Sequence, residues 1–173
     1  MFNPRVYSLD RWNAPIQENY MARTDLIDNL NQALSCELAA VIQYSQHSYL
    51  VTGHEREIFK DWFRDQAEEA QDHAESLGDK IVALGGVPTV EPATIRQSVE
   101  ISEMLKQDLE LEREAINVYM AAWASCDEND LPQKFWLEGR ISDEQMHIEE
   151  LEKLTSERKS RVDSEKIVLR EVS

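Results

Sequence analysis

Four stretches of the chain repeat apolar residues at alternating spacings of four and three, which places side chains on one face of an α-helix. They run from about Thr24 to Val51, from the following turn to about Leu84, from about Thr94 to Ser125, and from about Leu131 to Ser156. An amphipathic helix must bury its apolar face against another element. The pattern therefore predicts an all-α protein built from four helices.

The connections between these helices predict their arrangement. The turns at "TGHE" and "CDENDLP" are short, so helices one and two, and helices three and four, should each form an antiparallel hairpin. Asp130 and Pro132 are a typical N-cap and first-turn residue for the fourth helix. The longer segment "LGGVPTVEPAT" could run along the bundle, which predicts a four-helix bundle with one long crossover between helices two and three.

The length of the chain favours one domain. A chain of 173 residues can bury a substantial core, and two domains would each be small. We expect the bundle to span residues 24–156, after an N-terminal extension of residues 1–23. Residues 157–173 would form a short fifth helix or a loose tail.

The formal charge of −16 comes from 34 acidic and 18 basic side chains. It disfavours nucleic acid as a partner unless basic residues gather on one face, and it makes cations the more natural partners. The N-terminus has no apolar signal region, and no run approaches the ~18 apolar residues of a membrane span. Cys36 and Cys126 lie within helical patterns, which favours buried thiols and a reducing compartment. We therefore expect a cytoplasmic protein without a membrane partner.

Acidic residues and histidines interrupt the apolar faces of the helices. They are Glu37, His73, Glu112, Glu144 and His147. A single such Glu could reach the end of the bundle or pair with an Arg, but several unpaired buried carboxylates would each be costly. The apolar faces contain no Lys, and Arg140 is the only cation near Glu144. Two divalent metal ions would compensate these acids, and carboxylate with imidazole suits iron or manganese.

The two predicted hairpins look like copies of one unit. "ELAAVIQY" begins at Glu37 and "EREAINVY" at Glu112, and each places Ala three and Tyr seven residues after the Glu. His73 and His147 follow these glutamates at nearly equal distances along the chain. Glu144 and His147 form a Glu-x-x-His pair on one helix face, which leaves Glu37 and Glu112 as single glutamates in bridging or terminal positions.

The stretches "NQALSCELAAVIQYSQH", "EEAQDHAESLGDKIVALGGVPT", "MLKQDLELEREAI" and "DEQMHIEELEKL" resemble the ferritin superfamily, and bacterioferritins most closely. The resemblance covers about residues 25–154. It implies a ferritin-like bundle with a dinuclear iron centre that oxidises Fe²⁺. On the matching positions it implies iron-binding roles for Glu37, His73, Glu112, Glu144 and His147, with Glu37, Glu112, Glu144 and a nearby Tyr44 taking part in the oxidation. It also matches His47 to a family histidine on the inner surface.

The chain departs from this family at two positions. Ala70 stands where family members carry a Glu ligand, so His73 is left without its Glu-x-x-His partner. Glu69 is the nearest substitute, and a local π-bulge could turn it inward as a metal ligand. Gln71 stands where bacterioferritins carry the haem-ligating methionine, so haem is not expected.

The leading functional hypothesis is therefore a ferritin-like di-iron ferroxidase that binds Fe²⁺ and oxidises it with O₂ or peroxide. Iron storage or detoxification in a homo-oligomer is implied by the resemblance alone. Two alternatives stay open: a di-iron oxidase acting on an organic substrate, and a non-enzymatic bundle in which Ala70 marks a degenerate site. A DNA-protecting mini-ferritin is disfavoured by the acidic composition.

Overall fold

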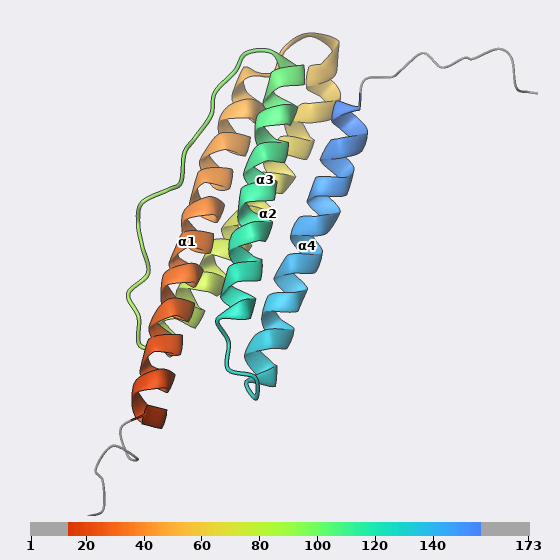
Figure 1. The fold of residues 1–173 in the computed structure, drawn as a ribbon. Coiled ribbons are helices and arrows are strands. Elements are labelled where there is room, and N and C mark those ends of the chain that lie inside the picture. The colour runs from red at the N-terminus through yellow and green to blue at the C-terminus, as the bar shows by residue number, and fades with distance from the viewer. Residues whose placement is uncertain (1–13, 157–173) are drawn as a thin grey trace, which may run out of the picture.

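The computed structural model describes residues 14–156, with side chains from residue 23 onward. Four long helices form a bundle (Figure 1): α1 Ala14–Leu50, α2 Arg56–Ala83, α3 Ile101–Ala124 and α4 Leu131–Thr155, with a short 3-10 helix, η2 Gly53–Glu55, after α1. The predicted all-α bundle with one long crossover is confirmed. Within residues 14–156, no helix is both long and apolar enough to cross a membrane. The predicted C-terminal helix lies outside the described residues.

Two predicted helix boundaries are wrong. Helix α1 begins at Ala14 and not at Thr24, so it includes part of the predicted extension. Pro15 does not prevent this, because proline is tolerated in the first turn of a helix. Helix α3 begins at Ile101 and not near Thr94, because main-chain N–H groups of the preceding segment donate to α1 and not to a helical turn.

Polar side chains on one face of α1 hold the crossover against the bundle. The crossover runs along α1 in Figure 1. Asn31 bonds to the main chain of residues 87 and 89, Ser35 to residues 91 and 93, and Gln43 to residue 96. These α1 positions lie four and eight residues apart, so they share one side of the helix. Their partners on the crossover are all main-chain atoms.

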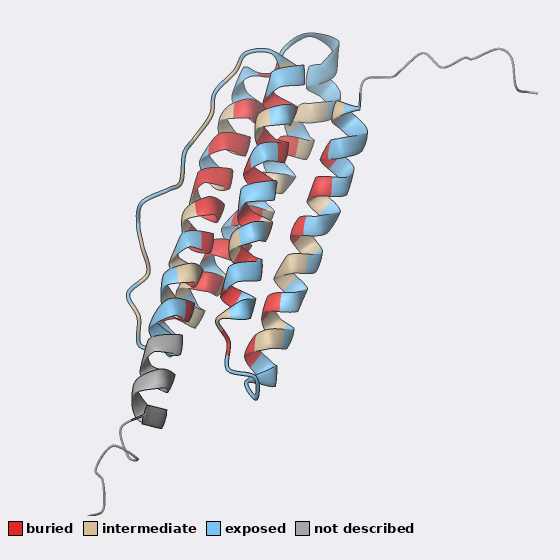
Figure 2. Ribbon diagram, in the orientation of Figure 1, coloured by how far each residue is buried: buried red, intermediate tan, exposed pale blue. Residues whose placement is uncertain are grey.

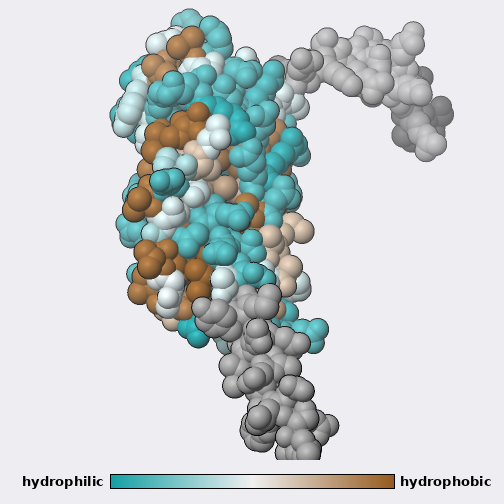
Figure 3. Space-filling model, turned by 60° about the vertical axis from the view of Figure 1, so that its left-hand side comes forward, coloured by the Kyte–Doolittle hydropathy of each residue, from teal (hydrophilic) through white to brown (hydrophobic). Residues whose placement is uncertain are grey.

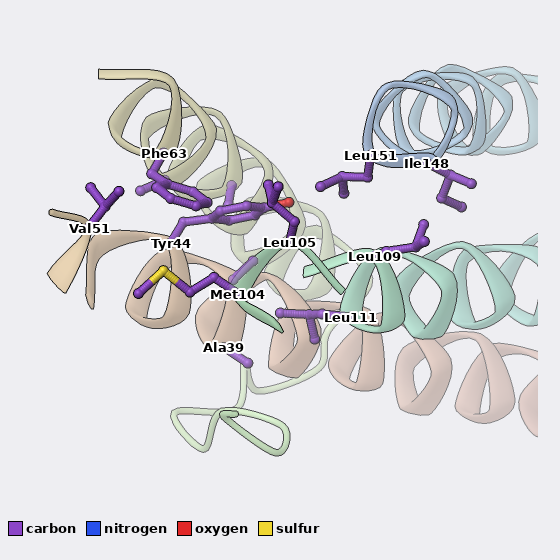
Figure 4. Packing of buried hydrophobic residues seen from close by; sticks show 13 residues of the cluster. Ala39, Tyr44, Val51, Phe63, Met104, Leu105, Leu109, Leu111, Ile148 and Leu151 are labelled. Carbon is purple, nitrogen blue, oxygen red and sulfur yellow. The ribbon is translucent and has the colours of Figure 1, made fainter. Parts of the chain in front are cut away.

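Buried side chains face the interior of the bundle (Figure 2) and form two apolar clusters. The first lies toward the α1–α2 turn and includes Tyr44 beside Phe63 (Figure 4). The second lies toward the other end and includes Leu30, Leu77 and Leu137. The five Glu and His residues that interrupt the apolar faces fall, on each helix, between the residues of these two clusters. The fold therefore places a polar layer in the middle of the bundle.

Candidate metal centre

The five Glu and His residues that interrupt the apolar faces converge in this middle layer from all four helices. Glu37 comes from α1, His73 from α2, Glu112 from α3, and Glu144 with His147 from α4. The three carboxylates and His73 are no more than 5% exposed, and His147 is partly buried. Each occupies the core-facing side of its helix, and the register between the helices brings the five side chains to the same level.

Glu144 is shared by two possible ligand groups. One group is Glu37, His73 and Glu144, the other is Glu112, Glu144 and His147, and the ligand atoms of each lie within 4.8 Å of one another. Glu144 Oε1 lies 3.3 Å from Nδ1 of His73, and Glu144 Oε2 lies 3.9 Å from Nδ1 of His147. A carboxylate with one oxygen toward each group is in the position of a bridging ligand.

The acids lack enough cations within the described part of the chain. Arg140 pairs with Asp143 at 2.9 Å and not with Glu144. Glu144 Oε1 is buried and accepts no hydrogen bond, although the His73 ring is close by. A buried acceptor without a donor is costly, and a bound cation removes that cost. The residues present therefore fit a pair of divalent metal ions.

Burial and neighbouring charges shift the pKa values of the groups in this layer in different directions. Burial raises the pKa of Glu144 well above its usual value, and the charges of Glu37 and Glu112 raise it further. Burial would also raise the pKa of Glu112, but hydrogen bonds with His147 and Glu144 lower it overall. Burial lowers the pKa of His147, but its contacts with Glu112 and Glu69 outweigh this effect and raise it to about 9. A cation that binds Glu144 and His147 would therefore compete with protons for these groups.

Two buried tyrosines hold the single glutamates. The Tyr44 hydroxyl on α1 donates to Oε1 of Glu112 at 2.5 Å, and the Tyr119 hydroxyl on α3 donates to Oε1 of Glu37 at 2.6 Å. Burial, followed by the acceptor glutamate, raises the pKa of each phenol well above its usual value. Both phenols therefore keep their protons and act as donors. Tyr44 thus lies beside the predicted centre, as expected.

The far nitrogen of each histidine faces an acid at the edge of the layer. His147 Nε2 lies 3.2 Å from Oε2 of Glu69, and His73 Nε2 lies 3.9 Å from Oδ2 of Asp143. Acids in this position orient a metal-binding ring and fix its tautomer. Glu69 belongs to neither of the two ligand groups, so its role as a metal ligand stays a prediction. Ala70 is buried in the first apolar cluster.

A second polar cluster lies one turn from the centre. Asp108 accepts from the Gln43 amide at 2.8 Å and lies 3.1 Å from Nδ1 of His47, and all three are fully buried. Burial raises the pKa of Asp108, against the effects of His47 and Gln43. The prediction of His47 on an inner surface is wrong for this chain, because the side chain is 0% exposed. In the other copy of the repeat, Ala33 and Ala122 occupy the positions of Asp108 and His47.

The sequence prediction assigned no role to Tyr119 or Asp143. The repeat contains a signal for Tyr119, because it follows Glu112 at the same spacing as Tyr44 follows Glu37. Asp143 precedes His147 by four residues, as Glu69 precedes His73. The same internal symmetry would therefore have identified both residues.

Comparison with known proteins supports this description. A family model described as a ferritin-like domain matches residues 27–159. A bacterioferritin of Brucella melitensis biotype 1 is 35% identical over 133 residues, covering 73% of this chain and 80% of the relative. The match to the family model includes every predicted ligand position.

Two solved structures have the same fold. A ferritin-like di-iron-carboxylate protein of Bacillus anthracis superposes with a TM-score of 0.74 at 32% identity, over 78% of this chain and 97% of that one. A dodecameric thioferritin of Bacteroides fragilis, described as bacterioferritin-related, gives a TM-score of 0.69 at 27% identity, over 76% and 84% of the two chains. On the family match and the identity to a bacterioferritin over most of both chains, this protein belongs to the ferritin-like family and is bacterioferritin-like.

Proposed function

We propose that this chain binds two Fe²⁺ ions in the middle layer of its bundle and oxidises them to Fe³⁺ with O₂ or peroxide. The ligands would be Glu37, His73, Glu112, Glu144 and His147. The observation that carries the proposal is Glu144, a buried carboxylate with one oxygen toward each of two ligand groups and with Oε1 lacking a hydrogen bond. Iron is the substrate here, and the protein supplies its binding site.

The protonation of the layer explains how binding would proceed. The raised pKa values of Glu144 and His147 favour their protonated forms in the metal-free protein, and two incoming Fe²⁺ ions would replace these protons with four positive charges. The bridging Glu144 would hold the two ions close together, so that they can deliver two electrons to one oxidant molecule. Glu69 and Asp143 would keep the imidazole rings of His147 and His73 turned toward the ions.

Ala70 leaves the α2 side of the centre with one carboxylate fewer than the α4 side. We propose that Glu69 can replace the missing ligand. To do so, its carboxylate would have to leave its contact with His147. Haem is not included, because Gln71 offers no thioether and instead donates to Glu75 on the surface.

We further propose that the protein acts in iron storage or detoxification as a cytoplasmic homo-oligomer. The related thioferritin is a dodecamer, and the name bacterioferritin belongs to a relative with 35% identity. Figure 3 shows hydrophobic side chains in patches on the face that carries the crossover, where Val87 and Val90 are more than 80% exposed. Exposed apolar patches of this kind are typical of subunit contacts.

An oxidase acting on an organic substrate is less well supported. Such an enzyme needs an apolar pocket that opens onto the metals. A cavity of about 420 Å³ lies between α1 and α3, but its lining, Gln32, Ser35, Cys36, Ala93, Glu114, Asn117 and Val118, includes none of the proposed ligands. It therefore gives no direct access to the centre.

An anaerobic titration tests the proposal. Fe²⁺ is added without oxygen, tightly bound ions are counted per chain, and air is then admitted while the ferric absorbance is followed. We expect about two ions per chain and fast oxidation, with both reduced in Glu144→Ala and retained in Glu149→Ala, a matched surface change on α4. If wild type binds Fe²⁺ no more tightly than Glu144→Ala does, both the ferroxidase hypothesis and the organic-oxidase hypothesis are overturned. The non-enzymatic bundle would then be the remaining hypothesis.

A further inference from the structure

The two buried phenols are related by the internal repeat, but they do not bond in the same way. Helices α1 and α3 each carry a Glu followed seven residues later by a Tyr, and each Tyr donates to the Glu of the other helix. The Glu and the Tyr are seven residues apart on both helices, so each helix donates one hydrogen bond to the other and accepts one from it. The repeat would make Tyr44 and Tyr119 equivalent if the surrounding residues were the same.

The contacts differ in which carboxylate oxygen each phenol reaches. Tyr44 donates to Oε1 of Glu112, whereas Oε2 of Glu112 is the oxygen that faces His147 at 3.8 Å. Tyr119 donates to Oε1 of Glu37, and this same oxygen faces Nδ1 of His73 at 3.4 Å. The Tyr119 hydroxyl is therefore aimed at the oxygen that Glu37 presents to the ligand group.

The His73 group contains the histidine whose helix lacks the carboxylate found at the matching position of the repeat. Helix α4 supplies both Glu144 and His147, but α2 supplies His73 with Ala70 one turn earlier. Glu144 is shared between both groups, so each group has one carboxylate of its own, Glu37 beside His73 and Glu112 beside His147. Because α2 supplies no second carboxylate, the position of Glu37 decides what the His73 group can offer an ion. A Glu side chain has several rotatable bonds, and a ligand that must be ordered when the metal binds contributes less affinity.

We propose that Tyr119 is a positioning residue that fixes Glu37 toward His73 and so compensates for the carboxylate that Ala70 lacks. This inference rests on the proposed two-ion centre. Tyr119 is 0% exposed and packs in the second apolar cluster, so its ring is held by neighbours while its hydroxyl orients Glu37. Removal of the hydroxyl alone keeps the packing and frees the carboxylate.

The test uses Co²⁺ as the probe, because it does not oxidise under these conditions and its visible absorption reports the ligands. Binding is measured for wild type, Tyr119→Phe and Tyr44→Phe. We expect two ions in wild type, and one of the two to bind about 10–100-fold more weakly in Tyr119→Phe, the usual effect of losing a group that orients a metal ligand. Unchanged thermal melting would show that the fold is intact.

A second substitution distinguishes compensation from general damage. Ala70→Glu should restore the lost affinity when combined with Tyr119→Phe, and it should not do so with Tyr44→Phe, which affects the Glu112 side. Two ions in Tyr119→Phe with wild-type affinities, or equal effects of Ala70→Glu in both backgrounds, would overturn the inference while leaving the proposed function intact. Fewer than two ions in wild type would overturn both.

Discussion

Replacement of Glu144 by Gln separates the metal-binding role of this residue from a structural one. Burial raises the pKa of Glu144 well above its usual value, which favours the neutral acid in the metal-free protein. Gln has the same shape as a neutral Glu and cannot ionise. If Glu144 is a ligand, Glu144→Gln removes metal binding without harm to the metal-free fold.

The sign and size of the stability change follow from proton linkage. Below pH 4.5 the folded and unfolded chains both carry the proton on Glu144, so its contribution to the free energy of unfolding is complete and does not change with pH. Above that value the unfolded chain loses the proton while the folded chain keeps it, so wild-type stability falls as pH rises toward the folded pKa. The fall is about 1.4 kcal/mol per pH unit. The Gln variant lacks this fall, so its free energy of unfolding should exceed that of wild type by a margin that grows, by at most about 1.4 kcal/mol per pH unit, as pH rises above 4.5.

Guanidinium unfolding followed by circular dichroism measures this difference. It is done with a chelator, at fixed protein concentration because assembly affects apparent stability. Added Zn²⁺ should then reverse the order, since only wild type gains binding free energy. Glu149→Gln, on the exposed side of α4, serves as the control and should change neither result. A loss of stability in Glu144→Gln that is constant with pH would refute the reasoning, because it would show an ionised Glu144 held by structural partners.

Three further predictions concern other groups. Because the pKa of His147 is raised to about 9, metal affinity should rise with pH from 7 to 9, and calorimetry in buffers of different ionisation enthalpy should detect proton release on Zn²⁺ binding. Asp108→Ala should lower the free energy of unfolding by about 3 kcal/mol, because His47 and Gln43 lose their buried acceptor; a loss under ~1 kcal/mol would contradict this. Gly86→Ala should destabilise by ~1–3 kcal/mol, since its Cβ would lie 2.7 Å from Ile27, as measured by thermal melting against the wild-type chain.

That the candidate ligands lie in the bundle interior could be predicted from the sequence, because their positions depend on helical periodicity. Glu37, Glu112 and Glu144 fall at the spacing of their apolar neighbours, so any bundle that buries these faces brings the acids inward. The start of α3 could not be predicted in the same way. Residues 94–98 contain no helix breaker. What keeps this segment from forming a helical turn is the hydrogen bonding of the main-chain N–H groups of Ala93 and Arg96 to α1, more than fifty residues earlier in the chain.

The details of the centre depend on how the helices lie against one another. The contact of Tyr119 with Glu37 requires the register between α1 and α3, and the contact of Glu69 with His147 requires the register between α2 and α4. Periodicity fixes the face on which a side chain lies but not its level along a neighbouring helix. The sequence therefore predicted the composition of the site and not its pairing.

The hydrogen bonds from α1 to the crossover do not depend on the side chains of the crossover. Asn31, Ser35 and Gln43 bond to main-chain atoms, which every residue type except proline offers in full. Side chains along the crossover, such as those of Val87 and Val90, can therefore change without loss of these bonds. The path of the crossover is encoded in the helix that it crosses, so within one subunit the outer surface of the crossover can change while the bundle beneath it keeps its geometry. Only contacts between subunits would restrict that surface.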